Sequence, residues 1–156
     1  PFNVFDYKEI NINNITNLNI KSPYLNNYTY SEIIAKINKF NKIKTISIDT
    51  FSSNFNDSFG NIKISKNLED LKEFTFNDFF EYKNIEKNKI VFKQDNYIDI
   101  DLFDIFSEIV ENEKNLEIIE LNGFHYNLNN ISNKNIKKLK INLEEDDKHY
   151  KINQTK

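Results

Sequence analysis

Residues 43–48 read Ile-Lys-Thr-Ile-Ser-Ile, and this spacing of apolar residues decides the fold. The same pattern, apolar-x-x-apolar-x-apolar, returns in four other segments, which begin at Ile15, Leu71, Leu116 and Ile136. Successive starts are 28, 28, 45 and 20 residues apart. Recurrence at such intervals indicates a repeat architecture.

Each unit is expected to form one short strand. Its fourth and sixth residues point to the same side, because side chains alternate along a strand. A single strand cannot bury that apolar side alone, whereas stacked parallel strands make a continuous core. We therefore predict about five parallel strands, with Ile46, Phe74 and Ile119 in one shared interior row.

Two segments between the strands have helical periodicity. Residues 31–40 carry apolar side chains on one face, and Ser31 is a candidate N-cap. Residues 101–113 carry a second apolar face. The apolar positions are Ile33, Ile34, Ile37 and Phe40 in the first segment, and Phe103, Phe106, Ile109 and Val110 in the second. These helices would return the chain along the outer side of the strands.

The 45-residue interval is too long for one return helix. The stretch 89–93 looks extended, and we expect an insert over about 82–98 that makes an excursion from the repeat. Residues 142–156 are interpreted as a C-terminal cap or tail. The whole chain, 1–156, is expected to be a single domain.

The composition excludes several classes of protein. The 156 residues have a net charge of −3 and contain no Cys, so disulfides and thiolate metal sites are excluded. No apolar run reaches the length of a membrane helix. The abundance of Asn, Ile and Lys is typical of an AT-rich genome. We expect a cytoplasmic location, although a secreted protein is also compatible because a removed signal peptide leaves no trace.

Residues that commonly carry chemistry are few. The two histidines, His125 and His149, have no metal-ligand spacing, and the two glycines cannot build a phosphate loop. The acidic run 144–147 is typical of a solvated edge. We therefore expect no enzyme activity, no catalytic residues, no cofactor and no metal. Nucleic-acid binding is unlikely because the chain has no Arg.

The five units resemble the leucine-rich-repeat superfamily over about residues 12–146. The second half is similar to bacterial leucine-rich-repeat proteins that occur beside WGR domains, although Asn77 and Phe92 stand where that group usually has Gly and Trp. The similar stretches are Phe76–Phe79, Lys89–Asp95, Leu116–Gly123 and Asn135–Ile141. The resemblance implies an α/β solenoid, a horseshoe fragment with strands on the concave side and helices and loops on the convex side. It also implies protein recognition without catalytic residues.

The third, fifth and seventh positions of the units would lie on the concave face and form a partner-binding surface. The candidate residues are Thr45, Ser47, Asp49, Glu73, Thr75, Asn77, Ile118, Glu120, Asn122, Lys138 and Lys140. The middle of this set is acidic, so we expect it to attract a protein or peptide with a basic centre. A merely soluble polar surface is an equally good interpretation.

Other interpretations remain open at this level. The pattern matches could be coincidental in an unrelated α+β domain. The leading functional hypothesis is a non-catalytic protein-interaction module, which we expect to be a monomer. The alternatives are a regulatory or substrate-recruiting domain of a larger protein that contains an enzyme, and an extracellular adhesin-like domain.

Overall fold

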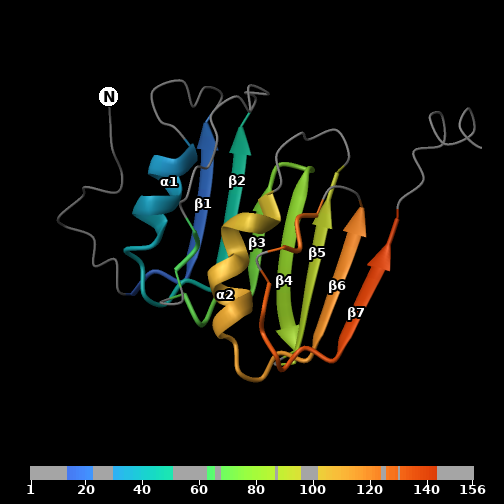
Figure 1. Cartoon of the computed structure of the whole chain (residues 1–156). Coiled ribbons are helices and arrows are strands. Elements are labelled where there is room, and N and C mark those ends of the chain that lie inside the picture. The colour runs from blue at the N-terminus through green and yellow to red at the C-terminus, as the bar shows by residue number, and fades with distance from the viewer. Residues whose placement is uncertain are drawn as a thin grey trace, which may run out of the picture.

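The computed structural model describes residues 14–22, 30–50, 63–65, 68–86, 88–95, 102–123, 126–129 and 131–143. Seven strands form one sheet in chain order, and the sheet does not close into a barrel (Figure 1). The strands are β1 (Asn17–Ser22), β2 (Thr45–Thr50), β3 (Glu73–Phe76), β4 (Phe80–Glu86), β5 (Lys89–Gln94), β6 (Ile118–Gly123) and β7 (Lys138–Asn142). With its helices, the chain is a mixed α/β protein, as predicted.

The pairing register follows the repeat units. Leu18 of β1 lies beside Ile46 of β2, and Ile46 lies beside Phe74 of β3, all in parallel strands. At the other end of the sheet, Ile119 of β6 lies beside Leu139 of β7. The predicted alignment is therefore confirmed within each side of the long interval. Across the interval it is wrong by two residues, because the row of Phe74 runs through Tyr82 and Phe92 to Leu121 and not to Ile119.

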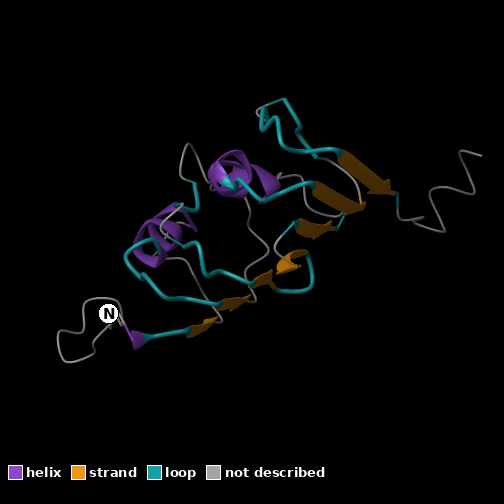
Figure 2. Cartoon of the chain, turned by 90° about the horizontal axis from the view of Figure 1, so that it is seen from below, coloured by secondary structure: helices purple, strands orange, loops and turns teal. Residues whose placement is uncertain are grey.

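The two predicted helices lie on the same side of the sheet (Figure 2). Helix α1 (Tyr30–Ile37) begins one residue before Ser31, so Ser31 lies in its first turn and not at the expected capping position. The second segment begins as a 3-10 helix, η3 (Leu102–Phe106), and continues as α2 (Ser107–Asn112). Three residues per turn place Phe103 and Phe106 on one side of η3, and both are buried.

The insert prediction is wrong in its geometry. Residues 82–86 and 88–94 do not make an excursion, because they belong to β4 and β5, which form an antiparallel hairpin within the sheet. Residues 96–98 of the expected insert lie outside the described residues. Strand β4 also pairs antiparallel with β3, whereas β5 pairs parallel with β6. The expected five parallel strands are thus seven strands, of which β4 runs in the opposite direction. Burial of Phe80 and Tyr82 explains why this hairpin stays in the sheet.

A cluster of aromatic rings holds the hairpin against the second helical segment. Phe106 contacts Tyr82 with ring centroids 4.6 Å apart, and it also packs against Phe74, Phe80 and Phe92. All five side chains are 1 % exposed or less. These rings connect β3, β4 and β5 to η3, so the centre of the sheet is packed directly against the second helical segment.

Candidate functional site

The sheet face turned away from α1 and α2 is named the open face here. Along β2, buried Ile46 and Ile48 alternate with half-exposed Thr45 and Ser47. The same alternation follows β3 and β6, so their polar residues face away from the helices. The open face therefore carries the predicted residues of β2, β3, β6 and β7, namely Thr45, Ser47, Asp49, Glu73, Thr75, Ile118, Glu120, Asn122, Lys138 and Lys140.

Asn77 does not continue this row. Strand β3 ends at Phe76, and Asn77 lies in the turn to β4 with a φ of 48°. Asn tolerates this left-handed conformation better than most residues. Its N–H still donates to the Ile48 carbonyl at 2.8 Å, so Asn77 marks the upper limit of the face beside β2.

The hairpin divides the predicted surface and adds charge that sequence reasoning missed. Lys83 of β4 lies beside Glu73, and Lys93 of β5 lies beside Asn122. The residues between Glu73 and Glu120 in the register are Lys83 and Val91. The two carboxylates are therefore two strands further apart than the sequence suggested, and the expected acidic middle is interrupted by lysines.

A signal for β5 was present in the sequence. Ile90 and Phe92 lie beside Ile119 and Leu121, which are the fourth and sixth residues of their unit. If Ile90 and Phe92 occupy the same positions, the unit that contains β5 begins at residue 87. That residue is Lys87, which does not satisfy the apolar first position. A search that required only the fourth and sixth positions would have found this strand.

Glu120 is the centre of a charge network on the open face. Its Oε1 lies 3.3 Å from Lys140 Nζ and 3.7 Å from Lys89 Nζ, and its Oε2 accepts a hydrogen bond from Asn122 Nδ2 at 3.2 Å. The Asn122 hydrogen bond, followed by these lysines, lowers the pKa of Glu120 below its ordinary value. The carboxylate therefore stays ionised and fixes the side chains of β5, β6 and β7 relative to one another.

This network predicts a specific pH dependence. A carboxylate whose pKa is lower in the folded state than in the unfolded state stabilises the folded state at pH values above its ordinary pKa. This contribution is lost as the pH falls through the lowered pKa. We expect Glu120→Gln to destabilise the protein at neutral pH, with the difference from wild type shrinking between about pH 5 and pH 3. Urea unfolding of both proteins across this range measures it, and a difference independent of pH would contradict the role of the charge.

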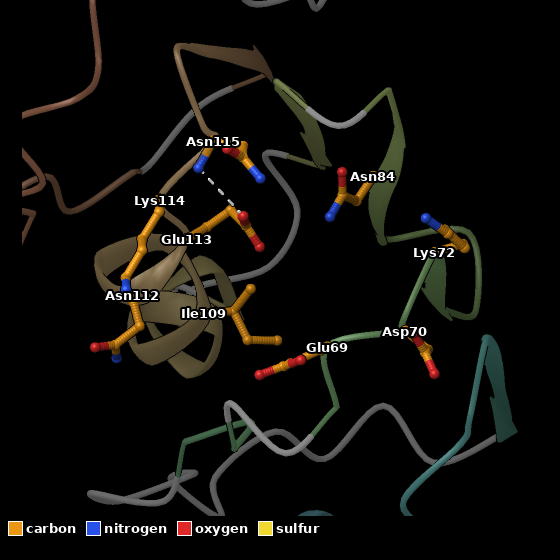
Figure 3. Close-up of a pocket in the computed structure, with 9 residues that line it drawn as sticks. All are labelled: Glu69, Asp70, Lys72, Asn84, Ile109, Asn112, Glu113, Lys114 and Asn115. Atoms are coloured by element: carbon orange, nitrogen blue, oxygen red, sulfur yellow. Dashed lines mark hydrogen bonds between the residues drawn. The ribbon is translucent and has the colours of Figure 1, made fainter.

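A polar recess of about 630 Å³ lies at the lower end of the sheet, between α2 and the strands (Figure 3). The side chains of Glu69 and Asp70 point in different directions there, and the Asn115 N–H donates to Glu113 Oε1 at 3.3 Å. The lining residues are Glu69, Asp70, Lys72, Asn84, Ile109, Asn112, Glu113, Lys114 and Asn115. None is a histidine, serine or threonine, and the charged groups that line the recess are carboxylates and lysines.

Asn84 connects this recess to the core. The Tyr82 phenol is hydrogen-bonded to the Asn84 side chain, and burial raises the pKa of Tyr82 far above its ordinary value. Tyr82 is therefore a neutral structural residue at physiological pH. Within the described ranges, no group of three His, Asp or Glu side chains is arranged to hold a metal ion. His125, His149 and the run 144–147 lie outside the described residues.

No protein-family model, curated protein or solved structure matches this chain. The function therefore has to be argued from the geometry of the open face and its edges. None of the helices in the described part of the chain has the length and apolar character needed to cross a membrane.

Proposed function

We propose that this chain is a non-catalytic protein-interaction module, built as a fragment of a leucine-rich-repeat solenoid, that binds its partner on the open face. The observation that carries the proposal is the arrangement of polar side chains from successive strands on one face, with both helices on the other (Figure 2). Such a face presents side chains at fixed spacings on a rigid scaffold. A rigid surface loses little conformational freedom when it binds.

A repeated backbone feature supports the solenoid part of the proposal. The carbonyl at the second position of a unit accepts N–H groups from the second and third positions of the next strand's unit. The carbonyls of Thr16, Lys44, Asn88 and Glu117 each accept both of these N–H groups, at 2.6–3.1 Å. The same junction thus occurs on both sides of the β4 strand, as expected for units that stack by one rule.

The charge of the β4–β7 part of the open face favours an acidic partner. Its β4–β7 part carries five lysines and three glutamates among the described residues: Lys83, Lys89, Lys93, Lys138 and Lys140, with Glu81, Glu86 and Glu120. Lys83, Lys93 and Lys138 form no ion pair within the described ranges. We therefore propose a partner with a negatively charged surface, in place of the partner with a basic centre expected from sequence.

These lysines would act mainly on the rate at which the partner associates. Charges on an exposed face raise the rate of encounter and select the partner, more than they add to affinity. Lys offers a point charge and no bidentate fork, so the face does not favour recognition of a planar phosphate or base pattern. Binding should weaken as ionic strength rises, since exposed charges are screened.

Random peptides displayed on phage provide the test. Selection on the wild-type protein should enrich peptides rich in Asp and Glu, and the enriched peptides should bind Lys83→Glu/Lys93→Glu about tenfold more weakly or worse. The matched control is Lys39→Glu/Lys42→Glu, which makes the same charge change at exposed positions near α1, outside the open face. Glu73→Lys should leave binding intact or strengthen it. Enrichment without an acidic bias, or equal binding to both double variants, contradicts the proposal.

The same face would serve the two alternative roles. A regulatory or substrate-recruiting domain and an extracellular adhesin-like domain both bind proteins, and they differ only in what adjoins them. Sequencing the full reading frame distinguishes them. An adjoining catalytic domain favours the first, and an encoded secretion signal favours the second.

A further inference from the structure

Strand β7 exposes apolar side chains that its counterparts bury. Leu139 is 47 % exposed and Ile141 is 51 % exposed, whereas Ile119 and Leu121 at the same positions of β6 are each 1 % exposed. Leu143, directly after the strand, is 59 % exposed. The apolar row that crosses the whole sheet thus continues to its last strand and is uncovered there.

The backbone at this edge is also available. The Lys138 N–H donates to the Glu117 carbonyl at 3.0 Å, which turns it toward β6. Because successive N–H groups along a strand point to opposite sides, those of Leu139 and Ile141 point away from β6. Within the described ranges β7 pairs only with β6, so its outer edge offers donors and acceptors to another strand.

We propose that the outer edge of β7 binds an extended segment of a partner protein in which apolar and acidic residues alternate. The segment adds an eighth strand to the sheet, its apolar side chains covering Leu139 and Ile141 and its carboxylates lying beside Lys138 and Lys140. The edge shares Lys138 and Lys140 with the open face, but its backbone groups and the side chains of Leu139 and Ile141 lie outside that face, and the proposal does not depend on the open-face site.

Strand β6 shows what kind of neighbour β7 accepts. On the face of the sheet that carries the helices, Ile119 and Leu121 of β6 lie beside Leu139 and Ile141 of β7. On the open face, the Glu120 carboxylate lies 3.3 Å from Lys140 Nζ. The pattern of β6 is thus alternately apolar and acidic or polar. Lys138, which forms no ion pair within the described ranges, would gain a carboxylate from a strand of the same pattern on the outer edge. Opposite charges in neighbouring strands stabilise their pairing.

The same lysines disfavour a second copy of this chain as the occupant. Two β7 strands paired about a two-fold axis would place Lys138 and Lys140 beside the same lysines of the other copy. Like charges directly opposite each other destabilise a strand pair. Lysines on an edge strand are also a common means of preventing self-association.

The test measures binding of a fluorescein-labelled peptide, Gly-Glu-Ile-Glu-Val-Glu-Ile-Glu-Gly, to the full chain by fluorescence anisotropy. We expect saturable binding that weakens about tenfold in Lys138→Glu/Lys140→Glu and in Leu139→Asn/Ile141→Asn. The opposite edge strand supplies the control: Lys21→Glu on β1 should change the affinity by less than about twofold. Because Leu139 and Ile141 are already half-exposed, their replacement should leave the fold intact, which thermal unfolding verifies.

Peptide controls keep the proposal testable even if a protein variant fails to fold. N-methylation of alternate peptide nitrogens removes the hydrogen-bond donors of one edge, and methylation of the edge that faces β7 should abolish binding. A peptide with Lys in place of Glu should not bind. Absence of binding by the acidic peptide overturns the proposal. Binding that persists when both edges of the peptide are N-methylated also overturns it.

Two further outcomes separate this proposal from its rivals. If the protein forms dimers that Leu139→Asn/Ile141→Asn dissociates, a second copy occupies the edge and the proposal fails. If Lys83→Glu/Lys93→Glu weakens binding of the peptide as much as the β7 variants do, the peptide binds the open face and edge binding is contradicted. Unchanged binding in that open-face variant supports the edge, whatever the outcome of the phage selection.

Discussion

Replacement of Phe106 with alanine is expected to lower the free energy of unfolding by about 3–5 kcal/mol, the usual cost of removing a large buried aromatic side chain. Phe106 is 0 % exposed, and its ring contacts those of Phe74, Phe80, Tyr82 and Phe92. Removal leaves a cavity where three strands meet η3. The loss therefore exceeds the burial of one ring, because its neighbours also lose contacts.

Urea denaturation monitored by tyrosine fluorescence or circular dichroism measures this loss. Ile85→Ala is the control, because Ile85 is apolar but 69 % exposed, and we expect it to change stability by less than about 0.5 kcal/mol. A loss below about 1 kcal/mol in Phe106→Ala would show that the aromatic cluster is loosely packed, in conflict with the ring distances.

The second large effect is expected at Gly123, the last residue of β6. Its φ is 103°, a conformation that residues with a side chain rarely adopt. A Cβ at this position would lie 1.9 Å from the Gln94 carbonyl oxygen, closer than any real contact. We expect Gly123→Ala to cost about 3 kcal/mol, from backbone strain and from separation of β5 and β6 at their upper ends.

Gln94 explains why this separation matters beyond the strand pair. Its side chain is fully buried, and its Oε1 accepts the Leu102 N–H at 2.8 Å, which fixes the beginning of η3. The effect of Gly123→Ala should therefore appear in hydrogen exchange at Leu102 as well as in the sheet. Lys93→Ala, an exposed change in the same strand pair, is the control. Equal stability of the two variants would contradict the close approach at Gly123.

Much of the fold could be predicted because apolar spacing reports burial directly. The row containing Leu18, Ile46 and Phe74 was identified from spacing alone, and the register places these residues side by side. The helical segments were also predictable, since Ile33 and Ile37 lie one turn apart and both are buried. The hairpin was missed because Lys87 interrupts the pattern of β5, and because nothing in spacing indicates that β4 runs antiparallel.

The binding surface was predicted less well than the fold. The polar residues of β2, β3 and β6 lie on one face, since alternation along a strand is a local property. Their charge environment is not local. The sequence repeat predicts Glu73 and Glu120 on neighbouring strands, but two strands that carry Lys83, Lys89 and Lys93 lie between β3 and β6.

The order of residues was sufficient to determine which side of each repeat strand is apolar and how repeat strands that pair directly align, because both follow from periodic burial. It did not determine the alignment across the hairpin, where Phe74 lies in the row of Leu121. Only the tertiary structure decided which strands are neighbours, which lysines surround Glu120, and that Leu139 and Ile141 remain uncovered at the edge of the sheet. These depend on contacts between segments far apart in the chain, and a local pattern carries no information about what lies beside it.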